Sequence, residues 1–126
     1  MADHDWVVRK LALYHRKQGD EVYADHYKGF KKPPLFQGPK GANYRPDVWV
    51  PAYGFVYEVE PYFTLERSLP QVKAFVNDQR ITDCVVVVSS GTDRGITHLE
   101  KMLDRKGVTA DVVNWRVLFD DLGITW

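Results

Sequence analysis

The fold is decided by residues 46–60, which read Pro46-Asp47-Val48-Trp49-Val50-Pro51-Ala52-Tyr53-Gly54-Phe55-Val56-Tyr57-Glu58-Val59-Glu60. Apolar side chains dominate Asp47–Val50 and Phe55–Glu60, which favours two β-strands. The residues between these strands are typical of a tight turn, because proline and glycine both suit the backbone angles of such turns. A two-residue loop with Pro51 opposite Gly54 fixes the register of the hairpin.

This register predicts that three carboxylates crowd one end of one sheet face. Counting back from the turn pairs Val50 with Phe55 and Asp47 with Glu58, while Glu60 points to the same face as Glu58. Like charges at this distance destabilise a sheet and raise each other's pKa unless a cation lies between them. Carboxylate oxygens suit Mg²⁺ or Mn²⁺. The alternative is that Asp47 is an ordinary turn residue and that the glutamates line a solvated strand face.

Helices and strands alternate around this hairpin. Apolar residues at helical or strand spacing predict a helix over 4–18, a strand over Glu21–His26, a helix over Ser68–Asn77, a strand over Thr82–Ser89, a helix over Ile96–Lys106, a strand over Ala110–Trp115 and a helical turn over Arg116–Leu122. The resulting order, α-β-β-β-α-β-α-β, predicts an α/β fold with a mixed central sheet and helices on both faces.

Residues 27–46 lack periodicity and carry only positive charges. These charges are Lys28, Lys31, Lys32, Lys40 and Arg45, and they alternate with the aromatic residues Tyr27, Phe30, Phe36 and Tyr44. A long connection of this kind is usually functional or disordered. We therefore expect a nucleic-acid contact in which lysines meet phosphates and aromatic rings stack on unpaired bases. The alternative is a flexible, solubilising loop.

Composition limits the classes of protein to consider. The 126 residues suit one domain spanning 1–126, and the net charge of zero argues against coating nucleic acid by bulk charge. The single cysteine, Cys84, lies in a valine run, which excludes a disulfide framework and a cysteine-based zinc site. The sequence has neither the pattern of a signal peptide nor an apolar run long enough for a membrane helix. We expect a cytoplasmic protein.

The Pro46-Asp47 pair, a hairpin and then Glu58-Val59-Glu60 resemble the motif of the PD-(D/E)xK nuclease superfamily. That superfamily includes restriction endonucleases, Holliday junction resolvases and RecB-type nucleases. The resemblance implies a restriction-endonuclease-like α-β-β-β-α-β core with the acids on its second and third strands. It runs from the N-terminus to the valine-rich strand.

The resemblance also implies roles for individual residues. Asp47, Glu58 and the Val59 carbonyl would bind the metal ion. Glu60 stands where most members have lysine, so either Glu60 serves as a metal ligand or general base, or a lysine elsewhere replaces it, or the site is degenerate. Lys73 is the first such lysine to consider. Two auxiliary residues are also implied, a first-helix polar residue at His4 and a helper glutamine at Gln71. The alternative for Lys73 and Gln71 is a solvated helix face, and for His4 a surface or capping role.

Three functions follow as hypotheses. The first is a Mg²⁺- or Mn²⁺-dependent DNA endonuclease that hydrolyses phosphodiesters through an activated water, with branched DNA as one candidate substrate. By analogy with small relatives, it would act as a homodimer. The second is a catalytically degenerate nuclease fold that binds DNA or a protein. The third is a structural or regulatory α/β domain without nuclease ancestry.

Overall fold

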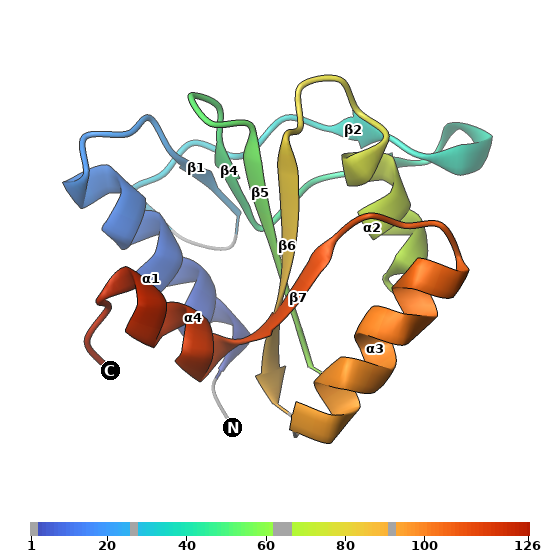
Figure 1. The fold of residues 1–126 in the computed structure, drawn as a ribbon. Helices are drawn as coiled ribbons and strands as arrows, with labels where there is room; N and C mark the ends of the chain where they lie inside the picture. The colour runs from blue at the N-terminus through green and yellow to red at the C-terminus, as the bar shows by residue number, and fades with distance from the viewer. Residues whose placement is uncertain (1–2, 26–27, 62–66, 91–92) are drawn as a thin grey trace.

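Five strands form one mixed sheet in the computed structural model, in the order β1-β4-β5-β6-β7 (Figure 1). Their bounds are Tyr23–Ala24 for β1, Val48–Val50 for β4, Phe55–Pro61 for β5, Asp83–Ser90 for β6 and Asp111–Asn114 for β7. Strands β1, β4 and β5 pair antiparallel, whereas β5, β6 and β7 pair parallel. The structure describes residues 3–25, 28–61, 67–90 and 93–126. The predicted α/β class with a mixed sheet is confirmed.

The predicted hairpin register is confirmed. Val50 pairs with Phe55 and Val48 with Tyr57, and the turn between the strands is closed by a hydrogen bond from the Gly54 N–H to the Pro51 carbonyl. Gly54 adopts a φ of 66°, which favours glycine. A side chain there would also approach the Arg80 carbonyl and Thr82. The turn therefore holds the register that places the carboxylates.

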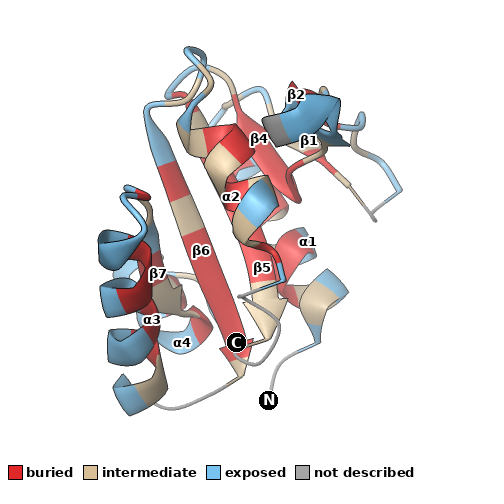
Figure 2. Ribbon diagram, turned by 90° about the vertical axis from the view of Figure 1, so that its right-hand side faces the viewer, coloured by how far each residue is buried: buried red, intermediate tan, exposed pale blue. Residues whose placement is uncertain are grey.

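Helices cover both faces of the sheet, as predicted, and the described residues form four of them (Figure 1). One face carries α1 (His4–Lys17) and α4 (Trp115–Leu122), and the other carries α2 (Leu69–Val76) and α3 (Asp93–Arg105). Alternating residues of β5 enter the two cores, with Val56 on the side of α2 and α3 and with Tyr57 and Val59 on the side of α1 and α4. Strand β6 lies between these layers and is buried over most of its length (Figure 2).

Residues 27–46, called the basic segment from here on, contain a second, two-stranded sheet that the sequence did not predict. Strands β2 (Phe36–Gln37) and β3 (Asn43–Tyr44) pair antiparallel around a 3₁₀ turn at Pro39–Gly41. Phe36 is 0% exposed and meets Trp49 and Phe75 edge-on. The expected connection without regular structure is therefore wrong for this part of the segment, because Phe36 anchors it in the core.

The remaining elements follow the predicted order, with changes at their ends. Strand β1 occupies only part of Glu21–His26, and His26 lies outside the described residues. The last strand stops at Asn114, whose side chain accepts a hydrogen bond from the Arg116 N–H and caps α4. Trp115 is therefore the first residue of a helix and not the end of a strand. None of the helices formed by the described residues has the length and apolar character that crossing a bilayer requires.

Candidate active site

An open cleft of about 410 Å³ lies where β4 begins and β5 approaches its end. Ten described residues line this cleft, namely His4, Asp25, Asn43, Tyr44, Arg45, Asp47, Glu58, Val59, Glu60 and Gln71. They come from α1, from the residue after β1, from β3 and the β3–β4 connection, from β5 and from α2, which are distant in sequence. The structure thus brings together most of the residues that the sequence singled out.

Asp47 and Glu58 form a buried carboxyl pair. They are 6% and 3% exposed, and their side chains are hydrogen-bonded to each other. Burial and then the charge of Asp47 raise the pKa of Glu58 well above its ordinary value. Burial opposes ionisation of Asp47 as well, but hydrogen bonds from His4 and Glu58 outweigh it and lower the Asp47 pKa. The raised pKa of Glu58 and the lowered pKa of Asp47 favour a proton on Glu58, which can then donate to the Asp47 carboxylate.

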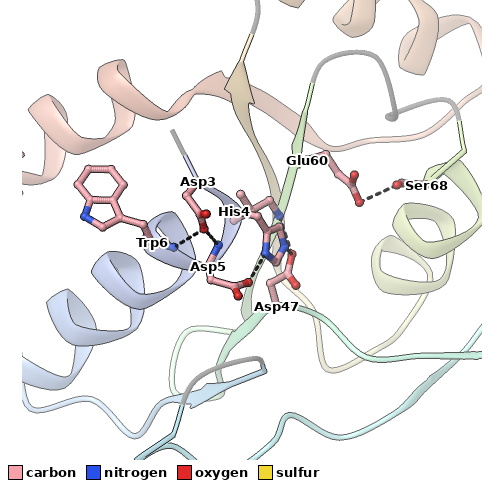
Figure 3. Close-up of polar contacts among 8 residues, drawn as sticks. Asp3, His4, Asp5, Trp6, Asp47, Glu60 and Ser68 are labelled. Carbon is pink, nitrogen blue, oxygen red and sulfur yellow. Dashed lines mark hydrogen bonds and ion pairs between the residues drawn. The ribbon is translucent and has the colours of Figure 1, made fainter. Parts of the chain in front are cut away.

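The Asp47 carboxylate has two further partners at the same oxygen. Asp47 Oδ2 accepts a hydrogen bond of 2.8 Å from the Val59 N–H. The same oxygen lies 3.2 Å from His4 Nε2, and Figure 3 shows His4 beside Asp47. The hydrogen bond to Asp47 raises the pKa of His4 to about 9, although partial burial opposes this shift. His4 is therefore an imidazolium at neutral pH, and it also contacts Asp5 through Nδ1 at 2.8 Å. The first-helix histidine is in the site, as expected.

Glu60 lines the cleft but points toward α2 (Figure 3). Its Oε1 accepts a hydrogen bond of 2.6 Å from the Ser68 hydroxyl, which lies just before α2. The negative charge of Glu60 contributes to the raised pKa of Glu58. Among the described residues, no three His, Cys, Asp or Glu side chains are arranged to hold a metal ion. The predicted group of three acids is thus a contacting pair with the third acid turned aside.

The pair and the neighbouring backbone suit a hard divalent cation. Mg²⁺ usually binds proteins through one or two carboxylates and keeps several waters. The β4–β5 register, continued by two residues, places Pro46 opposite Val59, and proline has no N–H to donate to the Val59 carbonyl. Asp47, Glu58 and this carbonyl are therefore the groups that could hold such an ion. The fit involves two carboxylates and does not need Glu60.

Gln71 and Lys73 lie differently on α2. Gln71 lines the cleft, whereas Lys73 is not among the described residues that do so. Residues two apart on a helix point in different directions, so α2 can direct only one of them to the site. The structure therefore supports the expected placement of the helper glutamine and not that of the replacement lysine.

The basic residues divide into two groups. Lys28, Lys31, Lys32 and Lys40 are exposed, and none of them is among the described residues lining the cleft. Arg45 is half-buried in the cleft, and its Nε donates a hydrogen bond of 2.8 Å to the Pro33 carbonyl.

The aromatic residues of the same segment are largely engaged with the protein. Phe36 is buried, Phe30 lies under the guanidinium of Arg16 at 3.6 Å, and Tyr44 packs against the core. Tyr27 lies outside the described residues. The expectation that these rings stack on bases is therefore wrong for Phe36. It has no support from the placement of Phe30 or Tyr44.

Sequence reasoning missed a polar network at the other end of α1. His15 is buried, with Nδ1 3.2 Å from Asp20 and Nε2 2.8 Å from the Tyr57 hydroxyl. The spacing of Val8, Ala12 and His15 places this histidine on the apolar face of the helix, and this signal could have revealed its burial. Asp25 and Ser68 were also missed as members or neighbours of the cleft, and no local pattern marks them.

Comparisons of the chain with protein-family models, with curated proteins and with solved structures found no match.

Proposed function

We propose that this protein is a divalent-metal-dependent DNA endonuclease with a restriction-endonuclease-like core. The observation that carries the proposal is the buried Asp47–Glu58 pair at the edge of an open cleft. The order α1-β1-β4-β5-α2-β6, with the β2–β3 hairpin inserted, agrees with the α-β-β-β-α-β order that the resemblance implies. The position of Asp47 directly before β4 and of Glu58 on β5 also supports the proposal, since the resemblance implies acids on two neighbouring strands.

Asp47, Glu58 and the Val59 carbonyl would hold Mg²⁺ or Mn²⁺. Such an ion, when bound, lowers the pKa of a coordinated water and stabilises charge on a phosphodiester. Glu58 must release its proton to serve as a ligand, so metal affinity should rise with pH. The His4 imidazolium limits the negative charge around Asp47. Glu60, oriented by Ser68, would accept a proton from the attacking water.

The exposed lysines of the basic segment would contact phosphates. Because Phe36 is buried and Phe30 is covered by Arg16, we propose contacts to the DNA backbone in place of stacking on bases. A symmetric homodimer would place two such sites on the two strands of a duplex. Branched DNA remains one of the substrates to compare.

A degenerate nuclease fold is the second candidate. The observation in its favour is that His4 already supplies a positive charge to Asp47, at 3.2 Å. Glu60 also replaces the usual lysine, and Lys73 is not among the described residues of the cleft. Such a protein would keep DNA or protein binding and would lose hydrolysis.

The test combines cleavage with thermal melting. Wild type and Asp47→Asn are incubated with duplex, branched and single-stranded DNA in Mg²⁺, Mn²⁺ or EDTA, and both are melted with and without metal. Asp104→Asn, an exposed carboxylate on α3, is the matched control. We expect metal-dependent cleavage and a metal-induced rise in Tm for wild type and the control, and neither for Asp47→Asn.

The other outcomes separate the alternatives. Salt-dependent DNA binding without cleavage or metal stabilisation would support the degenerate fold. Cleavage that persists in EDTA or in Asp47→Asn would overturn the proposed site. Absence of DNA binding, metal stabilisation and cleavage together would favour the structural or regulatory domain.

A further inference from the structure

The lining of the cleft has an excess of negative groups. Four carboxyl side chains contribute to it, Asp25, Asp47, Glu58 and Glu60, and a phosphate that enters must approach them. The cationic side chains among the described lining residues are His4 and Arg45. His4 already contacts two aspartates, Asp47 at 3.2 Å and Asp5 at 2.8 Å. Arg45 is thus the lysine or arginine placed to meet an incoming phosphate.

Arg45 enters the cleft two residues before the aspartate of the acid pair. Pro46 restricts the preceding residue, Arg45, to an extended conformation. Asp47 follows at the bend before β4, and both Arg45 and Asp47 line the cleft. The Arg45-Pro46-Asp47 sequence therefore contributes a cation and an acid to the same cleft.

The guanidinium of Arg45 is fixed at one atom and available at two others. Nε donates to the Pro33 carbonyl at 2.8 Å, and Pro33 itself is buried. This hydrogen bond limits the rotation of the side chain and leaves both Nη groups for a ligand. Two adjacent N–H groups of an arginine match two phosphate oxygens, and a fixed arginine loses less entropy when it binds.

We infer that Arg45 contacts the phosphate in the cleft and stabilises the charge that develops there, in the role that the resemblance gives to a lysine at the position of Glu60. This inference rests on the proposed function and concerns the same site. It assigns the positive charge to the β3–β4 connection and not to Lys73 on α2. Preorganised cations at a reacting phosphate act mainly on the transition state, so Arg45 should affect the rate more than the affinity.

The experiment compares Arg45→Met and Arg45→Lys with three lysine variants. Lys40→Met removes an exposed charge of the basic segment and is the comparison for DNA binding. Lys101→Met, at an exposed position on α3, is the control for cleavage, and Lys73→Met tests the alternative lysine. Binding of a short DNA duplex in EDTA is measured over a series of salt concentrations. Single-turnover cleavage is measured with Mg²⁺ at saturating DNA. Melting curves check folding, and Arg45→Gln replaces Arg45→Met if loss of the bond to Pro33 prevents folding.

We expect two separable results. In EDTA, the logarithm of the binding constant falls linearly with the logarithm of the salt concentration. Arg45→Met and Lys40→Met should each reduce the steepness of this line by about one, as expected for the loss of one phosphate contact. At saturating DNA, Arg45→Met should lower the cleavage rate by about a hundredfold, Arg45→Lys should fall between it and wild type, and Lys101→Met and Lys73→Met should match wild type.

The contrary outcomes distinguish this inference from the proposed function. An unchanged salt dependence for Arg45→Met, or a cleavage rate equal to that of Lys101→Met, overturns the role of Arg45 while the nuclease stands. A wild type that never cuts overturns the proposed function and, with it, the effect on rate. The salt dependence in EDTA then still decides whether Arg45 contacts a phosphate.

Discussion

A histidine on helix α1 contacts an aspartate outside the helix near each of its ends, His4 with Asp47 and His15 with Asp20, and each contact joins a ring nitrogen to a carboxylate oxygen at 3.2 Å. At the start of the helix, the pKa of His4 rises to about 9 because of its hydrogen bond to Asp47. Near its end, burial lowers the pKa of His15 below the ordinary value of 6.5, in spite of Asp20. The same residue types at the same distance are therefore charged at one end and neutral at the other.

Solvent exposure and the second partner of each ring explain the difference. The His4 side chain is 34% exposed, and its other nitrogen meets a second carboxylate, Asp5. The His15 side chain is 6% exposed, and its other nitrogen accepts a hydrogen bond from the Tyr57 hydroxyl. A protonated His15 would take that acceptor away from a buried hydroxyl. The cleft end thus keeps charges near water, while the far end is a neutral network that stabilises the fold.

The largest expected effect is that of Glu58→Gln at the cleft end. Cleavage should fall by about a thousandfold or more, roughly 4 kcal/mol of activation free energy, because a metal ligand is lost. The fold should not be destabilised, because the raised pKa of Glu58 favours its protonated form and glutamine has the same shape. Glu100→Gln, an exposed glutamate on α3, is the control.

The pH dependence of Glu58→Gln sharpens this prediction. A raised native pKa means that the folded protein binds the proton more tightly than the unfolded chain, so wild type loses stability as pH rises above 4.5, the ordinary value. The glutamine variant should gain stability relative to wild type over the same range in urea unfolding. A variant that cuts normally, or that is less stable at every pH, would contradict a protonated Glu58 and the assigned role.

At the far end, His15→Ala should act on stability alone. Loss of a buried ring and of its contacts with Asp20 and Tyr57 should lower the free energy of unfolding by about 2–3 kcal/mol. Urea unfolding measures this loss, and His98→Ala, at an exposed position, should change stability by less than about 0.5 kcal/mol. The cleavage rate of the folded variant should equal that of wild type. A selective loss of cleavage would mean that the two ends of α1 are coupled.

Glu60→Gln should have an intermediate effect, and mainly on activity. Cleavage should fall about tenfold, roughly 1.4 kcal/mol of activation free energy, if this carboxylate accepts a proton. The melting temperature without metal should rise slightly, because one charge near Glu58 is removed while an acceptor for Ser68 remains. Ser68→Ala removes the hydrogen bond and keeps the charge, so it separates orientation from charge. If Glu60→Gln melts and cuts like wild type, Glu60 is only a solvated strand residue.

The smallest expected effect is the alkaline loss of stability that His4 causes. Its native pKa is raised, so its contribution is complete below the ordinary pKa of 6.5 and is lost as pH rises through about 9. In wild type, His4 should account for a fall of about 1 kcal/mol in the free energy of unfolding over this pH range, because solvent screens the charge of a partly exposed ring. His4→Gln should not show this fall. Urea unfolding at neutral pH and at one unit above the His4 pKa measures the difference in the free energy of unfolding. The loss of stability at alkaline pH should persist in His15→Gln. If His15→Gln does not show this loss, then His15 and not His4 causes it.

The sequence predicted the parts of the site that depend on local geometry. The turn between Pro51 and Gly54 determines the hairpin register, and the register determines that Asp47 lies beside Glu58. The placement of Glu60 against Ser68 could not be predicted, because it depends on where α2 packs. The burial of Phe36 likewise depends on Trp49 and Phe75, which are distant in sequence. A count of charges and aromatic residues in the basic segment cannot show which rings the fold has already used.

The hydrogen bond from the Val59 N–H to Asp47 Oδ2 makes one backbone amide a spectroscopic reporter on the cleft. Its proton resonance depends on the charge of the carboxylate that accepts it, and Val59 is buried beside the residues proposed to hold a cation. An amide spectrum recorded during a titration would therefore register protonation of Asp47, loss of the His4 contact or arrival of a cation as a shift of a single assigned peak. No label or probe has to be introduced into the site.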